Sequence, residues 1–222
     1  MHGGGSHYHH AVKGLTMNKR NKRIVISISS VLLTAAAFSI NAANQVSNID
    51  DNSFNCIRDM TPVRHFYVDN LLGNTQGTLV VANNPEGAVY PEGSVVQLVP
   101  TEVMVKREAG TFPATGDWEF FELEVDEQGS TITKRGFTDV NNRFGGNCFT
   151  CHLPAAEKWD FVCESGHGCE PIPIDHSMTG ALQRSDPRCG EPELQDGDTF
   201  ALFKLNSMVV LGSAKKWLED LF

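Results

Sequence analysis

Residues Trp118 to Val125 read Trp-Glu-Phe-Phe-Glu-Leu-Glu-Val and show the clearest alternation of apolar and acidic side chains in the chain. From Phe121 onward the apolar and glutamate residues alternate, so the apolar ones share one face of an extended strand. Trp118 and Phe120 have the opposite parity. The stretch therefore predicts a β-strand that either changes phase at a bulge or is covered on both faces.

Short segments of β-like composition lie on both sides of this strand, separated by turn residues such as those at 91–93. The strand candidates are 78–82, 94–99, 102–106, 130–134 and 200–205, with 65–68 as either a short strand or the start of a helix. The helix candidates are 155–162, 177–183 with Ser177 as N-cap, and 207–222. The pattern predicts an α+β fold that is mainly an antiparallel meander of short strands, with a few short helices.

The chain begins with a segment typical of export. Met17 opens a basic run, an apolar stretch follows from Ile24 to Ile40, and small residues end it at 41–43. These features predict a signal peptide at 17–43 and a periplasmic protein, with an uncleaved anchor as the alternative. Residues 1–16, which include four His, are interpreted as a tag or a misassigned start.

The predicted strands lead to Cys148-Phe149-Thr150-Cys151-His152. In an exported chain, Cys-x-x-Cys-His is the attachment motif of a c-type haem. Two thiols three residues apart can each add to a haem vinyl group, and the adjacent imidazole then lies under the iron. A thioredoxin-like redox pair or half of a zinc site are the alternatives, but no second Cys-x-x-Cys exists in the chain. The motif predicts one covalently attached haem c.

The charge balance limits the partners. The formal net charge is −9, and removal of residues 1–43 takes away Lys13, Lys19, Arg20, Lys22 and Arg23 and no acid, which leaves −14. Such an acidic protein is not expected to bind nucleic acid or anionic membranes. The charge suits a basic redox partner, or it simply keeps the protein in solution.

Four further cysteines remain after the motif is set aside, namely Cys56, Cys163, Cys169 and Cys189. An even number in an oxidising compartment predicts two disulfides, and three pairings are possible. We favour Cys163–Cys169, which closes a small loop, and Cys56–Cys189; a Cys/His zinc cluster with His167 is the alternative. The mature chain is then expected to have a mobile leader at 44–61 and one domain at 62–222 that ends in a disulfide-containing extension.

Several features between Phe66 and Val162 occur together. They are the strand meander, Tyr90-Pro91-Glu92-Gly93, Met104-Val105-Lys106, Trp118, Gly145-Gly146-Asn147, the haem pentapeptide and Trp159-Asp160-Phe161-Val162. In combination they resemble the cytochrome P-460 family, which includes the cytochromes c′-beta. The haem pentapeptide is the specific motif, and the other features match at the level of pattern.

The resemblance implies a small antiparallel β protein, often dimeric, with a single haem c near the end of the meander. It assigns the thioether bonds to Cys148 and Cys151 and the proximal iron ligand to His152, with an open distal side. Family members either oxidise hydroxylamine or bind gases. The implied partners are a small gaseous or nitrogen-oxide ligand, a redox protein and a second copy of the chain.

One family feature has no clear counterpart in this chain. Hydroxylamine-oxidising members carry a lysine cross-linked to the macrocycle, in a strand where this chain has Gln97 and Leu98. Lys106 is the nearest later candidate, and an exposed lysine at a strand edge is its alternative identity. Without the cross-link, ligand binding is better supported than oxidation.

The first hypothesis is therefore an open iron site that binds nitric oxide or a related ligand in an apolar pocket. Candidate wall residues are Phe66, Trp118, Phe120, Phe121 and Phe144. The second hypothesis is an electron-transfer cytochrome with six-coordinate iron. Its candidate sixth ligands are Met60, Met104, Met178, Met208, His65, His167 and His176. A disulfide-rich sensor module is a third interpretation.

Overall fold

The computed structural model describes residues 46–219, with side chains described up to residue 211. These residues all belong to one compact unit of the chain. The expected tag at 1–16 and signal peptide at 17–43 lie outside the described residues. Within 46–219, none of the helices combines the length and the apolar character needed to span a bilayer.

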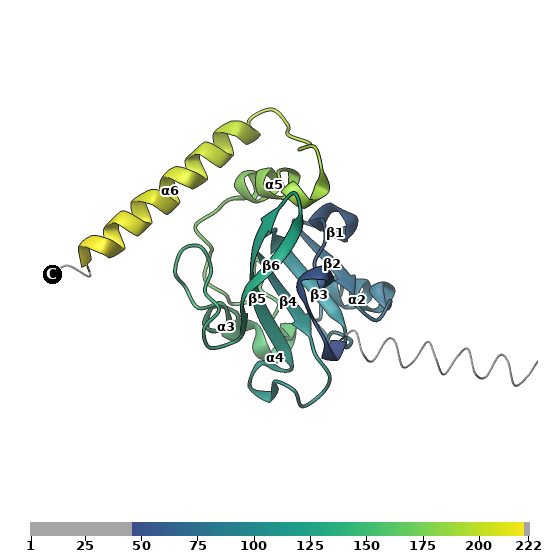
Figure 1. Cartoon of the computed structure of the whole chain (residues 1–222). Coiled ribbons are helices and arrows are strands. Elements are labelled where there is room, and N and C mark those ends of the chain that lie inside the picture. The colour runs from purple at the N-terminus through teal and green to yellow at the C-terminus, as the bar shows by residue number, and fades with distance from the viewer. Residues whose placement is uncertain (1–45, 220–222) are drawn as a thin grey trace, which may run out of the picture. The chain divides into compact units, whose positions relative to one another are not determined.

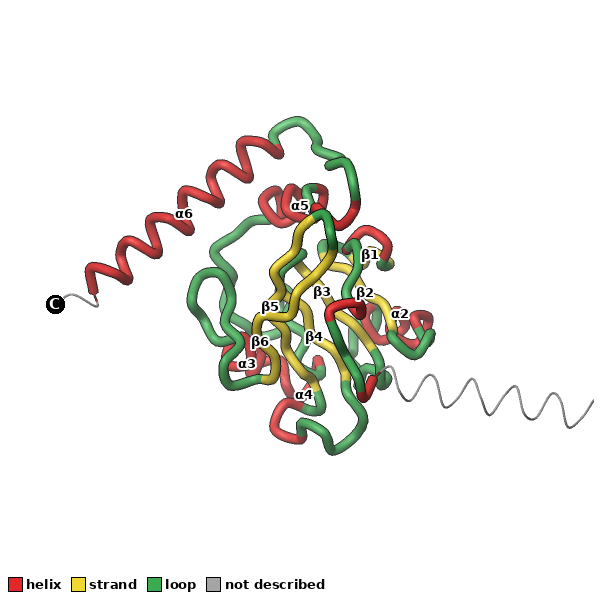
Figure 2. Tube along the Cα trace, in the orientation of Figure 1, coloured by secondary structure: helices red, strands yellow, loops and turns green. Residues whose placement is uncertain are grey.

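The centre of the fold is a six-stranded sheet in which every neighbouring pair is antiparallel and strand order follows the sequence (Figures 1 and 2). The strands are β1 (Thr61–Val63), β2 (Phe66–Asn70), β3 (Ser94–Val99), β4 (Glu102–Lys106), β5 (Trp118–Asp126) and β6 (Gly129–Gly136). Each strand thus pairs with the next one along the chain, which is the simplest antiparallel topology. The predicted α+β class and antiparallel meander are confirmed.

β5 is covered on both faces along its first half. Trp118 and Phe120 pack in one apolar cluster with Phe66, whereas Phe121 and Leu123 pack in a second cluster with Phe54. The register between β5 and β6 also shifts between Glu122 and Leu123. Coverage on both faces therefore explains the parity of Trp118 and Phe120. The register shift comes from an extra residue on β6, Thr133, and leaves Phe121 and Leu123 on the same face of β5.

The segment between β2 and β3 contains a helix where a strand was expected. Residues 78–82 belong to α2 (Thr75–Ala82), which begins after Asn74, whose side chain accepts a hydrogen bond from Gly77 N at 3.2 Å. The Thr78 hydroxyl lies 2.7 Å from that of Ser94 and accepts from Asn70 Nδ2. The prediction of a strand at 78–82 was wrong because these contacts bind the segment to the sheet in helical form.

The described residues before β1, which belong to the leader expected at 44–61, pack against the sheet. Val46, Ile49, Phe54 and Ile57 are buried. Two short 3₁₀ helices, η1 (Asp51–Ser53) and η2 (Ile57–Asp59), shape this segment. Arg135 donates to the carbonyl of Ile49 at 2.9 Å, which ties the segment to β6. From Val46 onward the leader is thus part of the domain, because its apolar side chains cover one face of the sheet.

After the Cys148–His152 segment the chain forms the short helix α4 (Ala156–Trp159) and then two longer helices, α5 (His176–Arg184) and α6 (Asp198–Glu219). The N-cap of α5 is Asp175, whose carboxylate accepts from Met178 N and from the Ser177 hydroxyl, so the expected Ser177 cap was wrong by two positions. The strand expected at 200–205 is also wrong, because these residues form the first turns of α6. Ala201 and Leu205 are buried against α5 while Phe200 and Phe203 are exposed, which is the spacing of a helix.

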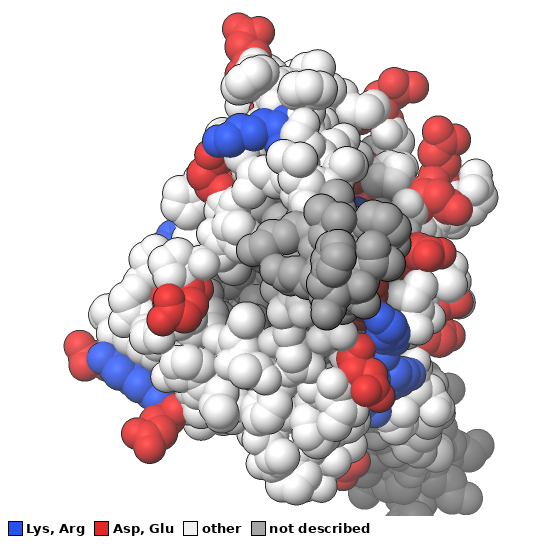
Figure 3. All heavy atoms as spheres, turned by 90° about the vertical axis from the view of Figure 1, so that its left-hand side faces the viewer, with Lys and Arg blue, Asp and Glu red and all other residues white. Residues whose placement is uncertain are grey.

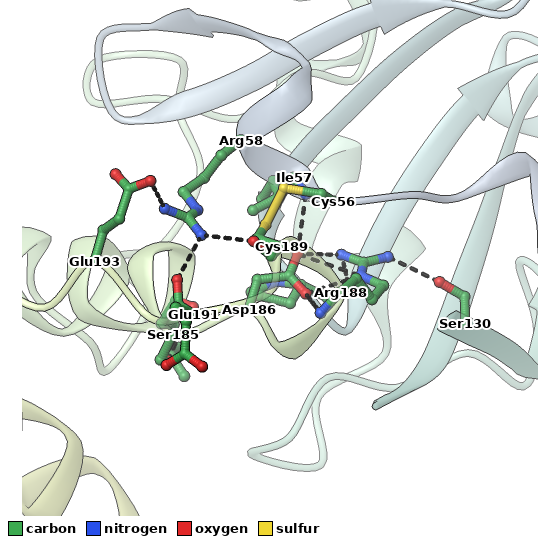
Figure 4. The surroundings of a disulfide bond; sticks show 12 residues. Cys56, Ile57, Arg58, Ser130, Ser185, Asp186, Arg188, Cys189, Glu191 and Glu193 are labelled. Carbon is green, nitrogen blue, oxygen red and sulfur yellow. Dashed lines mark hydrogen bonds and ion pairs between the residues drawn. A yellow bond between two sulfur atoms is a disulfide. The ribbon is translucent and has the colours of Figure 1, made fainter. Parts of the chain in front are cut away.

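Both predicted disulfides are confirmed, Cys56–Cys189 and Cys163–Cys169. The first joins the segment before β1 to η5 (Pro187–Cys189), which follows α5 (Figure 4). Beside it the fully buried Asp186 accepts from Ile57 N at 2.9 Å and pairs with Arg188. The sulfurs assigned to the alternative zinc cluster are therefore bonded to each other.

The surface shown in Figure 3 is largely uncharged, and its acidic side chains are scattered around the edge. Basic side chains lie between them in a few places. On this face the described residues form no broad field of a single sign.

Candidate functional site

The Cys148–His152 segment forms α3, a single turn of helix that is fixed at its start by Asn147. The Asn147 side chain accepts from Thr150 N at 3.0 Å, and its amide donates to the carbonyls of Phe137, Thr138 and Val140. One side chain thus caps the helix and holds the chain that follows β6. The pentapeptide alone does not indicate this role.

Hydrogen bonds within the loop before α3 also hold it in place. Asn142 Oδ1 accepts from Phe144 N and Gly146 N, and Gly145 has a positive φ of 83°. A Cβ atom at Gly146 would lie 3.3 Å from the Asn142 amide and 3.7 Å from Cys151 Sγ. The two glycines therefore allow a tight turn beside the second thiol.

Cys148 and Cys151 are the two cysteines that form no disulfide, although the other four do. Both lie on the single turn of α3, three positions apart. Cys148 is half-buried and packs against the first apolar cluster, whereas Cys151 is exposed. Burial, together with the nearby Glu102 carboxylate, raises the pKa of the Cys148 thiol to about 12.

His152 is held through one ring nitrogen. Its Nδ1 lies 2.7 Å from the carbonyl oxygen of Phe161, which only accepts, so Nδ1 carries the proton and Nε2 keeps its lone pair. Burial lowers the pKa of the imidazole below its ordinary value, which favours this neutral form. The ring meets Phe120 edge to face, with centroids 5.3 Å apart.

The sheet face beneath the motif carries three cross-strand pairs from β4 and β5. They are Lys106 with Trp118, Met104 with Phe120, and Glu102 with Glu122. The central pair is apolar and contacts His152 through Phe120. Burial raises the pKa of the Glu102 carboxyl, which accepts a hydrogen bond from Arg143 N at 3.2 Å.

Lys106 is not the exposed strand-edge lysine that was offered as its alternative identity, because it is only 6% exposed. Its Nζ lies 2.7 Å from both carboxylate oxygens of Asp160 and 2.6 Å from the carbonyl oxygen of Gly116. The ammonium also lies over the Trp118 ring, 5.2 Å from its centroid. The Lys106 ammonium is thus paired with the Asp160 carboxylate inside the protein.

The candidate wall residues separate into three groups. Phe66, Trp118 and Phe120 share the apolar cluster that contacts α3. Phe121 points to the opposite face of the sheet, and Phe144 is exposed in the loop before α3. The structure thus brings three of the five together with the motif.

The candidate sixth ligands are more dispersed. Met104 lies in the same cluster as Phe120. The remaining methionines pack in other clusters, with Met60 on the opposite face of the sheet and Met178 and Met208 between α5 and α6. The three histidines are engaged elsewhere: His65 and His176 face each other at 4.5 Å, and His167 stacks on Trp159 at 3.8 Å.

A cavity of about 280 Å³ lies beside the motif region, between the end of α2 and residues 159–167. Tyr90, Trp159, Val162 and His167 line it, and Arg64 and Glu164 form an ion pair at its wall. Cys148, Cys151 and His152 are not among its lining residues. The cavity is therefore a neighbour of the candidate site rather than part of it.

Comparison with protein-family models, with curated proteins and with solved structures found no match to this chain.

Proposed function

We propose that this chain is an exported, periplasmic mono-haem c-type cytochrome of the cytochrome P-460 type. Cys148 and Cys151 carry the thioether bonds, and His152 Nε2 is the proximal ligand. A bound haem supplies an iron centre for ligand binding and one-electron exchange. The ligand is nitric oxide or a related small nitrogen compound, and hydroxylamine oxidation is the further activity of this class.

The pairing state of the cysteines is the observation that carries the proposal. Four cysteines close disulfides, and the two that do not are those of the Cys-x-x-Cys-His motif. Beside them is an imidazole whose proton is committed to a carbonyl, so its second nitrogen is free to bind a metal. Two adjacent thiols and one such imidazole are the donor set that a c-type haem requires.

The apolar sheet face supports an uncharged ligand. Phe66, Met104 and Phe120 lie on it together, and neutral diatomic molecules enter such surroundings without the cost of desolvating a charge. The engagement of Lys106 with Asp160 supports ligand binding without the lysine cross-link of the hydroxylamine-oxidising members.

Electron transfer with six-coordinate iron is the second candidate function, and the position of Met104 favours it. Met104 is 4% exposed and pairs with Phe120, the residue that contacts His152. If this side chain supplied the sixth ligand of a bound haem, its thioether would raise the reduction potential. A redox partner and a homodimer are compatible with either function.

The test is expression of the mature chain together with cytochrome maturation machinery. The wild-type protein is expected to gain the mass of one haem and to show a high-spin ferric signal that changes on addition of nitric oxide. His152→Ala is expected to keep the covalent haem and lose this ligation. His167→Ala is the matched control, because its Nδ1 also contacts a backbone carbonyl, that of Val162 at 2.7 Å.

A colourless wild-type protein without added mass refutes the proposal. A low-spin ferric signal that Met104→Leu converts to high spin selects the electron-transfer alternative. An identical loss of ligation in His152→Ala and His167→Ala contradicts the assignment of His152.

A further inference from the structure

The Lys106–Asp160 ion pair is buried on both sides, with each side chain 8% exposed. Taking two charges out of water costs free energy that their attraction only partly returns. Asp160 also accepts from Tyr90 N at 2.8 Å, so the carboxylate joins three separate segments of the chain. The site described above gives this arrangement no chemical task.

The backbone at Asp160 is unusual and leads directly to the proximal histidine. Asp160 and Phe161 have positive φ values of 47° and 65°, a conformation that is unfavourable for two consecutive residues with side chains. This pair of residues turns the carbonyl of Phe161 onto His152 Nδ1. Phe161 N donates in turn to the Ala155 carbonyl at 3.2 Å, which closes the turn.

Lys106 holds this turn from two directions. Besides Asp160, its ammonium donates to the carbonyl of Gly116. A Cβ atom at Gly116 would lie 2.9 Å from the Phe161 ring, so the glycine permits close contact with that ring. The Lys106 ammonium therefore holds both the Asp160 carboxylate and the Gly116 backbone, which lies against the Phe161 ring.

We propose that Lys106 and Asp160 are positioning residues, which hold the Asp160–Phe161 turn so that the Phe161 carbonyl accepts the Nδ1 proton of His152. This inference rests on the proposed function. When Nδ1–H donates a hydrogen bond, Nε2 donates its electron pair more strongly to a bound iron, and this favours ferric over ferrous iron. Loss of the pair is expected to loosen this bond and shift the balance toward ferrous iron.

The test is the double variant Lys106→Met with Asp160→Asn. It removes both charges, leaves no unpaired ion in the core, and keeps an oxygen that accepts from Tyr90 N. The matched control is Arg107→Met with Glu119→Gln. Arg107 and Glu119 also form a buried ion pair, and Arg107 directly follows Lys106 in the chain. The ion-pair partners of Glu119 are Arg107 and Arg135, and neither of them pairs with Asp160.

For the haem-loaded protein we expect about a tenfold shift of the ferric–ferrous equilibrium toward ferrous in the double variant, which is about 59 mV for one electron. The control pair should keep the wild-type potential. A haem-loaded double variant with an unchanged potential overturns the inference and leaves the proposed function standing.

A second measurement does not depend on haem. In the full chain without haem, NMR should detect a protected Nδ1 proton on His152 in the wild type and in the control pair. The double variant should lose this signal. If the wild type takes up no haem, the proposed function fails, and persistence of the Nδ1 signal in the double variant would still refute the positioning role.

Discussion

The two motif thiols have different surroundings although they share one helical turn. Cys151 is exposed, whereas Cys148 is half-buried beside Glu102, with a pKa raised to about 12. Only the thiolate reacts as a nucleophile, so about 10⁻⁴ of Cys148 is reactive at pH 8. In the folded, haem-free chain the two thiols should therefore react with an alkylating reagent at different rates.

We predict that iodoacetamide labels Cys151 well before Cys148 in this haem-free chain, as followed by peptide mass spectrometry. Raising the pH should accelerate labelling of Cys148 about tenfold per unit below its pKa, because its thiolate fraction grows in that proportion. In urea the two rates should converge. Equal rates in the folded chain at pH 8 would contradict the burial of Cys148.

At the scale of the element, β5 separates two cores that differ in their relation to α3. Phe120 faces His152, and Phe121, the next residue, packs with Phe54 at a centroid distance of 5.1 Å on the other face. Adjacent residues of the same type and similar burial thus form a natural pair for comparison.

We predict that Phe120→Ala and Phe121→Ala each lower the free energy of unfolding by about 3–5 kcal/mol, the usual cost of removing a buried phenyl ring. Urea unfolding measures this loss. With the haem that we propose in place, only Phe120→Ala should also change its spectrum, because the Phe120 ring contacts His152. A spectral change of the same size in Phe121→Ala would show that the two faces are coupled.

The local sequence pattern predicted most strands of the sheet correctly, but it predicted the helices of the fold less well. β3 and β4 are short runs of mainly β-branched residues bounded by turn residues, and β5 alternates from Phe121 onward, so these signals are visible in one sequence. Residues 78–82 are rich in β-branched side chains, but contacts from Asn70, Asn74 and Ser94 make them helical. The contacts with Asn70 and Ser94 depend on the finished sheet, whereas the Asn74 cap is a local signal that the strand prediction did not use.

The candidate site likewise combines features that the local sequence shows with features that depend on contacts between distant residues. Its two thiols and its imidazole lie within five consecutive residues and were predicted as a site from their spacing. Lys106 and Asp160 are 54 residues apart, and an ordinary strand lysine gives no sign of an acidic partner in a later turn. The role of the Phe161 carbonyl was equally hidden, because any residue type supplies a carbonyl.

For the whole molecule, the two disulfides span very different lengths of chain. Cys56–Cys189 has a sequence separation of 133 residues, and Cys163–Cys169 has a separation of 6. A cross-link restricts the unfolded chain more when it closes a longer loop. The first bond should therefore contribute more to stability, although the second lies nearer to α3.

We predict that Cys56→Ser with Cys189→Ser lowers the free energy of unfolding by about 5 kcal/mol, and Cys163→Ser with Cys169→Ser by about 2 kcal/mol, from loop entropy. Urea titration of the two double variants measures both values. If the proposed haem is bound, its spectrum should be largely unchanged in each variant. A larger loss from the short loop would mean that it supports the fold by other means.

The Cys56–Cys189 bond also makes a covalent ring of the sheet, α3 and α5. One peptide-bond cut anywhere inside that ring opens it without releasing a fragment. A nicked molecule would run as a single species until a reductant is added, and only then divide in two. Damage by proteases would thus leave the pieces tethered and able to stay assembled.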